Sequence, residues 1–130
     1  MEVQAEAGNK DKIVFKYFEL GLFLFNNQEF YLAHESFEKA WNITDNKDKL
    51  FLQGLIQISV GSYFCLNCNY INAVKQYKKG INKLELFRPV FMNVDVEKLL
   101  FWINELLLEM NFTKNDIILT KKIKSICLID

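Results

Sequence analysis

Residues 30–41 read FYLAHESFEKAW, and residues 70–80 read YINAVKQYKKG. These stretches belong to a pattern that repeats after forty positions: Gly21, Phe30, Ala33, Phe37 and Ala40 recur as Gly61, Tyr70, Ala73, Tyr77 and Gly80. Residues three and four apart share one face of a helix. Small residues on both sides of an aromatic therefore predict that a neighbouring helix approaches closely around the ring. The sequence thus predicts an internal repeat of two helical hairpins.

Helical periodicity extends over most of the chain, and no stretch alternates like a half-buried strand. We predict helices over residues 12–25, 29–41, 49–66, 70–85 and 96–110. Asp45 or Asn46 can cap the third helix, Pro89 closes the region after the fourth, and Asp95 can cap the fifth. The fifth has a wide apolar stripe of Leu99, Leu100, Ile103, Leu106 and Leu107. The predicted fold class is all-α, a compact bundle of about five to six helices built from two antiparallel hairpins plus a C-terminal helix.

A chain of 130 residues is expected to form one domain. Residues 1–11 are polar and are predicted to form a disordered N-terminal tail, and residues 12–112 form the helical domain. Residues 113–130 contain ILTKKIKSICLI, which fits either an amphipathic C-terminal helix or a packed tail. Apolar faces here and on the fifth helix can close the core or cover a second subunit, so the oligomeric state stays open.

The charge balance argues against two classes of partner. There are 16 basic and 16 acidic residues, and Arg88 is the one arginine. A chain without net charge has no field to attract nucleic acid or an anionic membrane, and the apolar runs are interrupted and too short to span a bilayer. We therefore predict no nucleic acid and no membrane as partners.

The three cysteines, Cys65, Cys68 and Cys127, are an odd number in a chain without an apolar targeting segment. This favours a reducing, intracellular compartment. Cys65 and Cys68 have C-x-x-C spacing, but a zinc site needs two more ligands with paired spacing, which the sequence lacks. We predict no metal site and no cofactor.

The only histidine, His34, defines the candidate site. At ~100° per residue, His34, Glu38 and Trp41 share a boundary strip of their helix, with Glu35 further towards solvent. Gln53, Gln57, Val60 and Phe64 form a similar strip on the third helix. We predict that the two strips face each other, and that Asn69 can join them. The set is then either a buried hydrogen-bond network or the lining of a ligand site with Trp41 and Phe64 as its apolar wall.

Enzymatic alternatives lack parts of the usual patterns. A metalloprotease helix needs H-E-x-x-H, and Glu38 stands where the second histidine belongs. Nucleophilic catalysis needs Ser or Cys beside His34; Ser59, Ser62 and Cys65 lie on the third helix, but their spacing singles none of them out. The alternative function is a metal-dependent or His/Glu-based hydrolase, in which His34 is the base or ligand and Glu38 orients it.

Two family resemblances add to this interpretation. Leu20–Gly21 and the small-aromatic-small helix resemble the tetratricopeptide hairpin, although the period exceeds the ~34 residues of that family. LFNNQEFYLAHESFEKAW (24–41), QGLIQ (53–57), and Asn69 with Ala73 closely resemble a family known only as domain of unknown function number three hundred and nine, over about residues 18–107. Asn72 replaces that family's usual glycine. The resemblance implies a small all-helical protein of bacteria or plastids and implies no activity.

We therefore predict a non-enzymatic binding or scaffold module that takes a protein partner or a small molecule at the His34 helix. The abundance of Lys, Asn and Ile is typical of AT-rich genomes. Together with the family's presence in plastids, it predicts an organelle-encoded protein of the chloroplast stroma, with a bacterial cytoplasm as the alternative.

Overall fold

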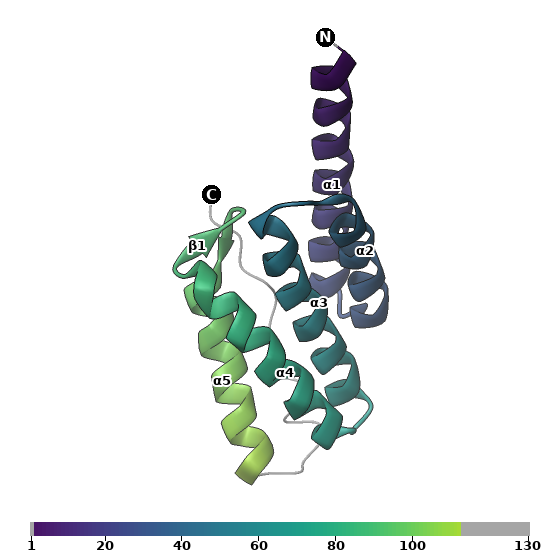
Figure 1. Cartoon of the computed structure of the whole chain (residues 1–130). Helices are drawn as coiled ribbons and strands as arrows, with labels where there is room; N and C mark the ends of the chain where they lie inside the picture. The colour runs from purple at the N-terminus through teal and green to yellow at the C-terminus, as the bar shows by residue number, and fades with distance from the viewer. Residues whose placement is uncertain (1, 113–130) are drawn as a thin grey trace.

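The structure, a computed structural model, describes residues 2–112 and the side chains of residues 8–110. Its elements, in chain order, are α1 (Glu2–Asn26), α2 (Phe30–Ile43), α3 (Lys47–Leu66), α4 (Tyr70–Leu84), the short 3₁₀ helix η1 (Glu85–Phe87), β1 (Val90–Phe91), β2 (Val94–Asp95) and α5 (Val96–Phe112). The helices lie side by side as a bundle (Figure 1). The all-α fold class is confirmed. The predicted helix or tail at 113–130, including Cys127, lies outside the described residues.

The forty-residue repeat is confirmed at the level of single hydrogen bonds. The side-chain amides of Asn27 and Asn67 donate to the carbonyls of Phe23 and Tyr63, at 2.7 and 2.8 Å. The next residues, Gln28 and Cys68, both adopt left-handed backbone conformations, with φ of 62° and 61°. The backbone N–H groups of Glu29 and Asn69 then donate to Leu24 and Phe64, at 2.8 and 2.9 Å. The α1–α2 and α3–α4 turns therefore end and restart their helices in the same way.

The predicted close approach of the helices also occurs in both hairpins. Gly21 lies against the ring of Phe37, and Gly61 lies against the ring of Tyr77. A Cβ atom on Gly61 would be 2.8 Å from Cδ1 of Tyr77, well inside van der Waals contact. Both rings are fully buried. Glycine at these two positions lets each pair of helix backbones come close enough to enclose a ring.

Helix α3 is the centre of the bundle, because α2 packs on one side of it and α4 on the other. Its sequence is apolar on several faces, and Phe51, Leu52, Leu55 and Ile58 are fully buried. By length and composition alone, α3 could also cross a membrane, and half of that window is buried inside the bundle. The same properties are typical of the central helix of a helical bundle.

The hairpin of β1 and β2 was not predicted. Val90 pairs with Asp95 and Phe91 with Val94 in an antiparallel arrangement. Met92 and Asn93 between them have φ of 46° and 62°, the backbone conformation that a two-residue hairpin turn requires. Each strand has two residues, too few for an alternating pattern to be visible in the sequence.

Helix α1 begins at Glu2, so residues 2–11 are helical and not the predicted disordered tail. Residues 2–12 contain Glu, Gln, Ala and Lys, which favour helix, and they contain no proline. The ammonium of Lys10 also pairs with the carboxylate of Asp45 in the α2–α3 loop. The N-terminal half of α1 projects beyond the other helices (Figure 1).

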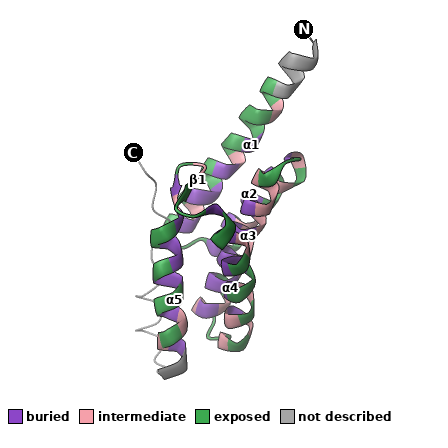
Figure 2. Cartoon of the chain, turned by 60° about the vertical axis from the view of Figure 1, so that its left-hand side comes forward, coloured by how far each residue is buried: buried purple, intermediate pink, exposed green. Residues whose placement is uncertain are grey.

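Helix α5 follows β2 directly. Oδ1 of Asp95 accepts a hydrogen bond from the backbone N–H of Lys98 at 3.0 Å, as a capping residue does. The predicted apolar stripe faces inward, with Leu107 half-buried and the other four members buried. Buried and exposed residues accordingly lie on opposite sides of α5 (Figure 2).

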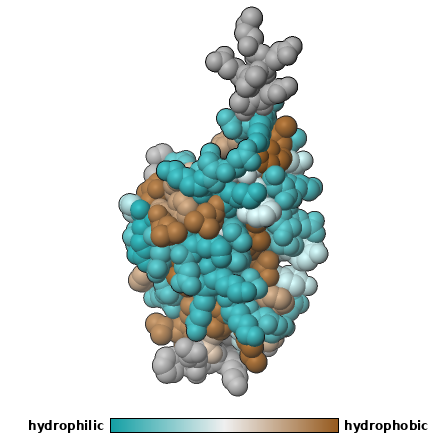
Figure 3. Space-filling view, in the orientation of Figure 1, coloured by the Kyte–Doolittle hydropathy of each residue, from teal (hydrophilic) through white to brown (hydrophobic). Residues whose placement is uncertain are grey.

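The surface is mainly hydrophilic in the view of Figure 3, with separate hydrophobic patches. The exposed large apolar side chains are distributed over all five α-helices, η1 and β1: Ile13, Phe15, Leu20, Phe23, Tyr31, Leu32, Tyr63, Ile71, Leu86, Val90, Phe101 and Leu108. Scattered apolar side chains of this kind are normal on a protein surface.

Candidate functional site

A cavity of about 490 Å³ lies where α2, α3 and α4 meet. Its lining residues are Glu38, Trp41, Asn42, Gln53, Ile56, Gln57, Gln76 and Lys79. Four of them were predicted as site residues: Glu38 and Trp41 from α2, and Gln53 and Gln57 from α3. The predicted strips of these two helices do meet across their shared boundary. We call this space the polar cavity.

Amide groups dominate the polar cavity. Oε1 of Gln57 accepts a hydrogen bond from the ammonium of Lys83 at 2.8 Å, across the α3–α4 contact. The amides of Gln53 and Gln76 form no hydrogen bond with any other residue that the structure describes. A set of amides that satisfied one another would be a closed structural network. Here at least two amides keep their hydrogen-bonding groups available.

His34 lies beside the polar cavity and not in it. Its side chain is 16% exposed, and its Nδ1 is 2.6 Å from the backbone oxygen of Tyr31. Because a carbonyl only accepts, Nδ1 carries the proton, and Nε2 is left facing Oε1 of Glu38 at 3.5 Å. His34 lines a separate cavity of about 130 Å³ with Tyr31, Val60, Tyr63 and Phe64, which we call the aromatic pocket.

Trp41 closes one wall of the polar cavity. The ammonium of Lys49 lies 4.1 Å from the centre of its ring, at cation–π distance. The indole Nε1 is buried and has no hydrogen-bond partner among the described residues. Since that nitrogen is sealed from solvent, Trp41 offers the cavity its ring and not its N–H.

The other two predicted site residues lie elsewhere. Asn69 is the N-cap of α4, where its Oδ1 faces the backbone N–H of Asn72 at 3.5 Å. Glu35 is half-buried on α2 and lines neither cavity. Neither side chain contributes to the two spaces that the predicted strips form.

The residues that were considered as nucleophiles have structural roles. The hydroxyl of Ser59 donates to the backbone oxygen of Leu55 at 2.8 Å, and Ser62 shares a 2.7 Å hydrogen bond with the hydroxyl of Tyr77. Cys65 is buried. Within the described part of the chain, no three His, Cys, Asp or Glu side chains gather in a group that could hold a metal ion.

Sequence reasoning did not include the contribution of α4. Gln76 and Lys79 line the polar cavity, and Lys83 reaches Gln57 from the next turn. Their spacing of three and four residues places them on one face of the helix. This face adjoins the buried face of Ala73, Tyr77 and Gly80, so the same periodicity could have identified it.

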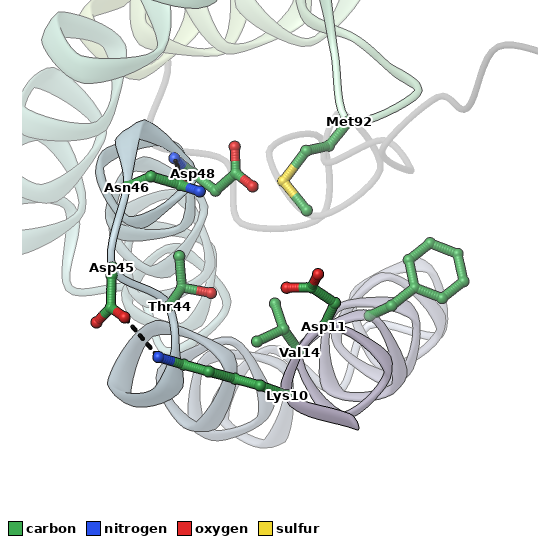
Figure 4. A pocket seen from close by; sticks show the side chains of 9 residues that line it. Lys10, Asp11, Val14, Thr44, Asp45, Asn46, Asp48 and Met92 are labelled. Atoms are coloured by element: carbon green, nitrogen blue, oxygen red, sulfur yellow. Dashed lines mark hydrogen bonds and ion pairs between the residues drawn. The ribbon is translucent and has the colours of Figure 1, made fainter. Parts of the chain in front are cut away.

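A third space, of about 520 Å³, lies between α1, the α2–α3 loop with the start of α3, and the β1–β2 turn. Figure 4 shows its acidic side chains, Asp11, Asp45 and Asp48, together with Met92 from the β1–β2 turn. The hydrogen bond and positive charge of Lys10 lower the pKa of the Asp45 carboxyl, with a smaller contribution from Lys49. The sequence did not predict this space, because it depends on the N-terminal extension of α1.

The fold and the polar cavity define a small all-α protein of two equivalent helical hairpins with amides at the contact between them. The sequence profile of the family called Domain of unknown function (DUF309) matches residues 18–76, so this part of the chain is similar to that family. The predicted resemblance is confirmed over that range, which ends before the predicted limit at residue 107. It includes Glu38, Trp41, Gln53, Gln57 and Gln76. No curated protein matches the chain.

Proposed function

We propose that the chain is a non-enzymatic binding module and that the polar cavity is its ligand site. The observation that carries this proposal is that the side-chain amides of Gln53 and Gln76 have hydrogen-bonding groups available. Both amides line the cavity, and neither has a hydrogen-bond partner among the described residues. Both side chains are half-buried, so their amides are open to water, and a ligand can replace the water that they hold.

The lining indicates the chemistry of the ligand. Each amide offers both a donor and an acceptor, and Glu38 and Lys79 add one negative and one positive charge. The ring of Trp41 and the side chain of Ile56 supply an apolar wall. A volume of about 490 Å³ is within the range of small-molecule sites. We therefore expect a small polar molecule that carries both donors and acceptors, rather than a flat apolar one.

A ligand screen on the folded protein tests this proposal. Polar metabolites would be added to ¹⁵N-labelled protein, and the side-chain amide signals of Gln53, Gln57 and Gln76 would be followed by NMR. A supporting result is a compound that shifts these signals saturably and that binds about three- to tenfold more weakly to Gln53→Ala and to Gln76→Ala, the loss expected for one hydrogen bond.

Asn82→Ala is the matched control, because Asn82 is an exposed amide of α4 outside the cavity. It should leave the affinity unchanged. The proposal fails if no compound shifts the cavity amides, or if both glutamine variants bind as the original chain does. If Gln53→Ala and Gln57→Ala instead unfold the protein and the screen finds nothing, the amides serve the fold alone.

We also propose the chloroplast stroma as the compartment, supported by the near-absence of arginine beside abundant lysine and by the family resemblance. Immunodetection in fractionated cells tests this. Recovery with soluble stromal proteins supports the proposal, and recovery elsewhere contradicts it.

A further inference from the structure

The aromatic pocket has a composition different from that of the polar cavity. Four of its five lining residues carry rings: Tyr31 and His34 from α2, and Tyr63 and Phe64 from α3. The ring centres of Tyr31 and His34 are 4.9 Å apart, and those of Tyr31 and Tyr63 are 5.6 Å apart. Tyr63 and Phe64 follow at 5.9 Å. The rings therefore form a continuous wall around a space of about 130 Å³.

Two of these rings are not part of the buried core. Tyr31 is 53% exposed and Tyr63 is 39% exposed, although both are large and touch each other. The fully buried rings of Phe37 and Tyr77 fill the hairpin contacts instead. Half-exposed rings that gather around a small open space leave their faces available to a ligand.

The electrostatics of the pocket favour a cation. The faces of aromatic rings carry negative partial charge and attract positively charged groups. Among the residues that the structure describes, no lysine or arginine lines the pocket. The charged side chain that contacts it is Glu38, whose Oε1 is 3.5 Å from Nε2 of His34. A carboxylate behind a wall of rings increases the attraction for a cation and gives an anion no partner.

The mainly apolar lining selects the kind of cation. A primary ammonium loses hydrogen bonds to water that ring faces and a valine replace only in part, whereas a quaternary ammonium has no such bonds to lose. We propose that the aromatic pocket binds the quaternary ammonium group of a small free molecule, with Tyr31, Tyr63 and Phe64 as the cage and Glu38 as the balancing charge. The pocket is separate from the polar cavity, so this inference does not rest on the proposed function.

A pair of molecules with the same shape tests the proposal. Choline carries a trimethylammonium group, and 3,3-dimethylbutan-1-ol has a neutral tert-butyl group in its place. Each would be titrated into the folded protein while the ring signals of Tyr31, Tyr63 and His34 are followed by NMR. We expect choline to shift these signals saturably and to bind at least about tenfold more tightly than the neutral alcohol. Equal or tighter binding of the alcohol, or no shift with choline, would overturn the proposal.

Leucine variants separate the ring face from simple apolar contact. Tyr31→Leu and Tyr63→Leu keep an apolar side chain and remove the ring, so each should weaken choline binding by about three- to thirtyfold. Binding of the neutral alcohol should change much less. Phe23→Leu is the control, because Phe23 is an exposed ring of α1 that does not line the pocket. If the two tyrosine variants, shown folded by circular dichroism, bind choline as before, the cage is not the site.

Glu38→Gln tests the balancing charge in the same titration. It should weaken choline binding and leave binding of the alcohol unchanged. Gln53→Ala should affect neither, since Gln53 lines the polar cavity alone. A loss of choline binding in Gln53→Ala would place the cation in the polar cavity and contradict the assignment.

Discussion

Gly21 and the ring of Phe37 lie so close together that any side chain on residue 21 would overlap the ring carbons. Gly61 and Tyr77 repeat this relationship in the second hairpin, where a Cβ would be 2.8 Å from the ring. Both rings are fully buried, so neither can turn away into solvent. Each hairpin of the bundle is therefore built around one glycine–ring contact.

The first prediction follows from this contact. Gly21→Ala and Gly61→Ala should each lower the free energy of unfolding by about 1–3 kcal/mol, the usual cost of overpacking a core. This loss should appear although alanine favours helix over glycine by about 1 kcal/mol. Urea unfolding followed by circular dichroism measures the change.

Gly8→Ala on the same helix is the matched control. Nothing lies within 4 Å of a Cβ built at Gly8, so this variant should be neutral or more stable by up to about 1 kcal/mol. Phe37→Leu should reduce the cost of Gly21→Ala, since a smaller side chain makes room for the methyl group. Unchanged stability of Gly21→Ala would show that the hairpin does not depend on the close contact.

Much of the fold could be predicted because the hairpins depend on local pattern. The forty-residue repeat, the caps at Asn46 and Asp95, and the stripe of α5 are all visible as residue spacing. The β1–β2 hairpin is not, because its strands are short and its position depends on contacts distant in sequence. The ring of Phe91 packs on Phe51 and Phe87, with ring centres 5.0 and 4.6 Å away.

The candidate site could be predicted only in part. Helical periodicity placed Gln53, Gln57, Val60 and Phe64 on the α3 face that meets α2, and the structure agrees. It did not show that this strip serves two separate spaces. Gln53 and Phe64 are eleven positions apart, or about 16 Å along a helix, which is too far for one small site. Glu38 belongs to both spaces, because it lines the polar cavity and also contacts His34 of the aromatic pocket.

The second prediction concerns Tyr77 and alkaline pH. Burial raises the pKa of the Tyr77 hydroxyl well above its ordinary value, and the hydrogen bond with Ser62 opposes this. Because the pKa is raised in the folded state, the protonated Tyr77 hydroxyl contributes its full stability to the fold below the ordinary pKa of ~10. This contribution is lost as the pH rises above that value. Tyr77→Phe should therefore make the fall in stability between about pH 9 and 11 shallower.

At neutral pH the same variant should be less stable by about 1–3 kcal/mol, because Ser62 loses its buried partner. Adding Ser62→Ala should recover part of this loss. Tyr63→Phe is the control, since Tyr63 is 39% exposed, and it should cost much less stability at neutral pH than Tyr77→Phe does. A Tyr77→Phe protein that unfolds with base as steeply as the original chain would contradict the assignment.

The third prediction concerns the start of α3. Oδ1 of Asn46 accepts a hydrogen bond from the backbone N–H of Asp48 at 2.9 Å and so caps the helix that forms the centre of the bundle. Asn46→Ala should lower the free energy of unfolding by about 1 kcal/mol, and Asn46→Asp should be nearly neutral because aspartate caps equally well. Thermal unfolding of the three proteins compares them. Equal losses in both variants would mean that the side-chain cap is not the cause.

The last prediction concerns the ion pair that holds the extended α1 to the α2–α3 loop. Lys10 lowers the pKa of Asp45, first through its hydrogen bond and then through its charge. Because the pKa of Asp45 is lower in the folded state than in the unfolded chain, its ionised carboxylate stabilises the fold at pH values above the unfolded pKa. This stabilisation is lost as the pH falls through the folded pKa. Lys10→Gln should raise the pKa of Asp45 towards 3.8, and Lys49 should keep it from returning completely. An NMR titration of the Asp45 carboxyl measures this.

Lys12→Gln, at an exposed position one half-turn along α1, should leave the titration unchanged. High salt should mimic Lys10→Gln, because the pair is exposed and salt screens exposed charges. If Asp45 titrates alike in the Lys10→Gln and original proteins, residue 10 does not reach the loop in solution, and the acidic space of Figure 4 has no wall on that side.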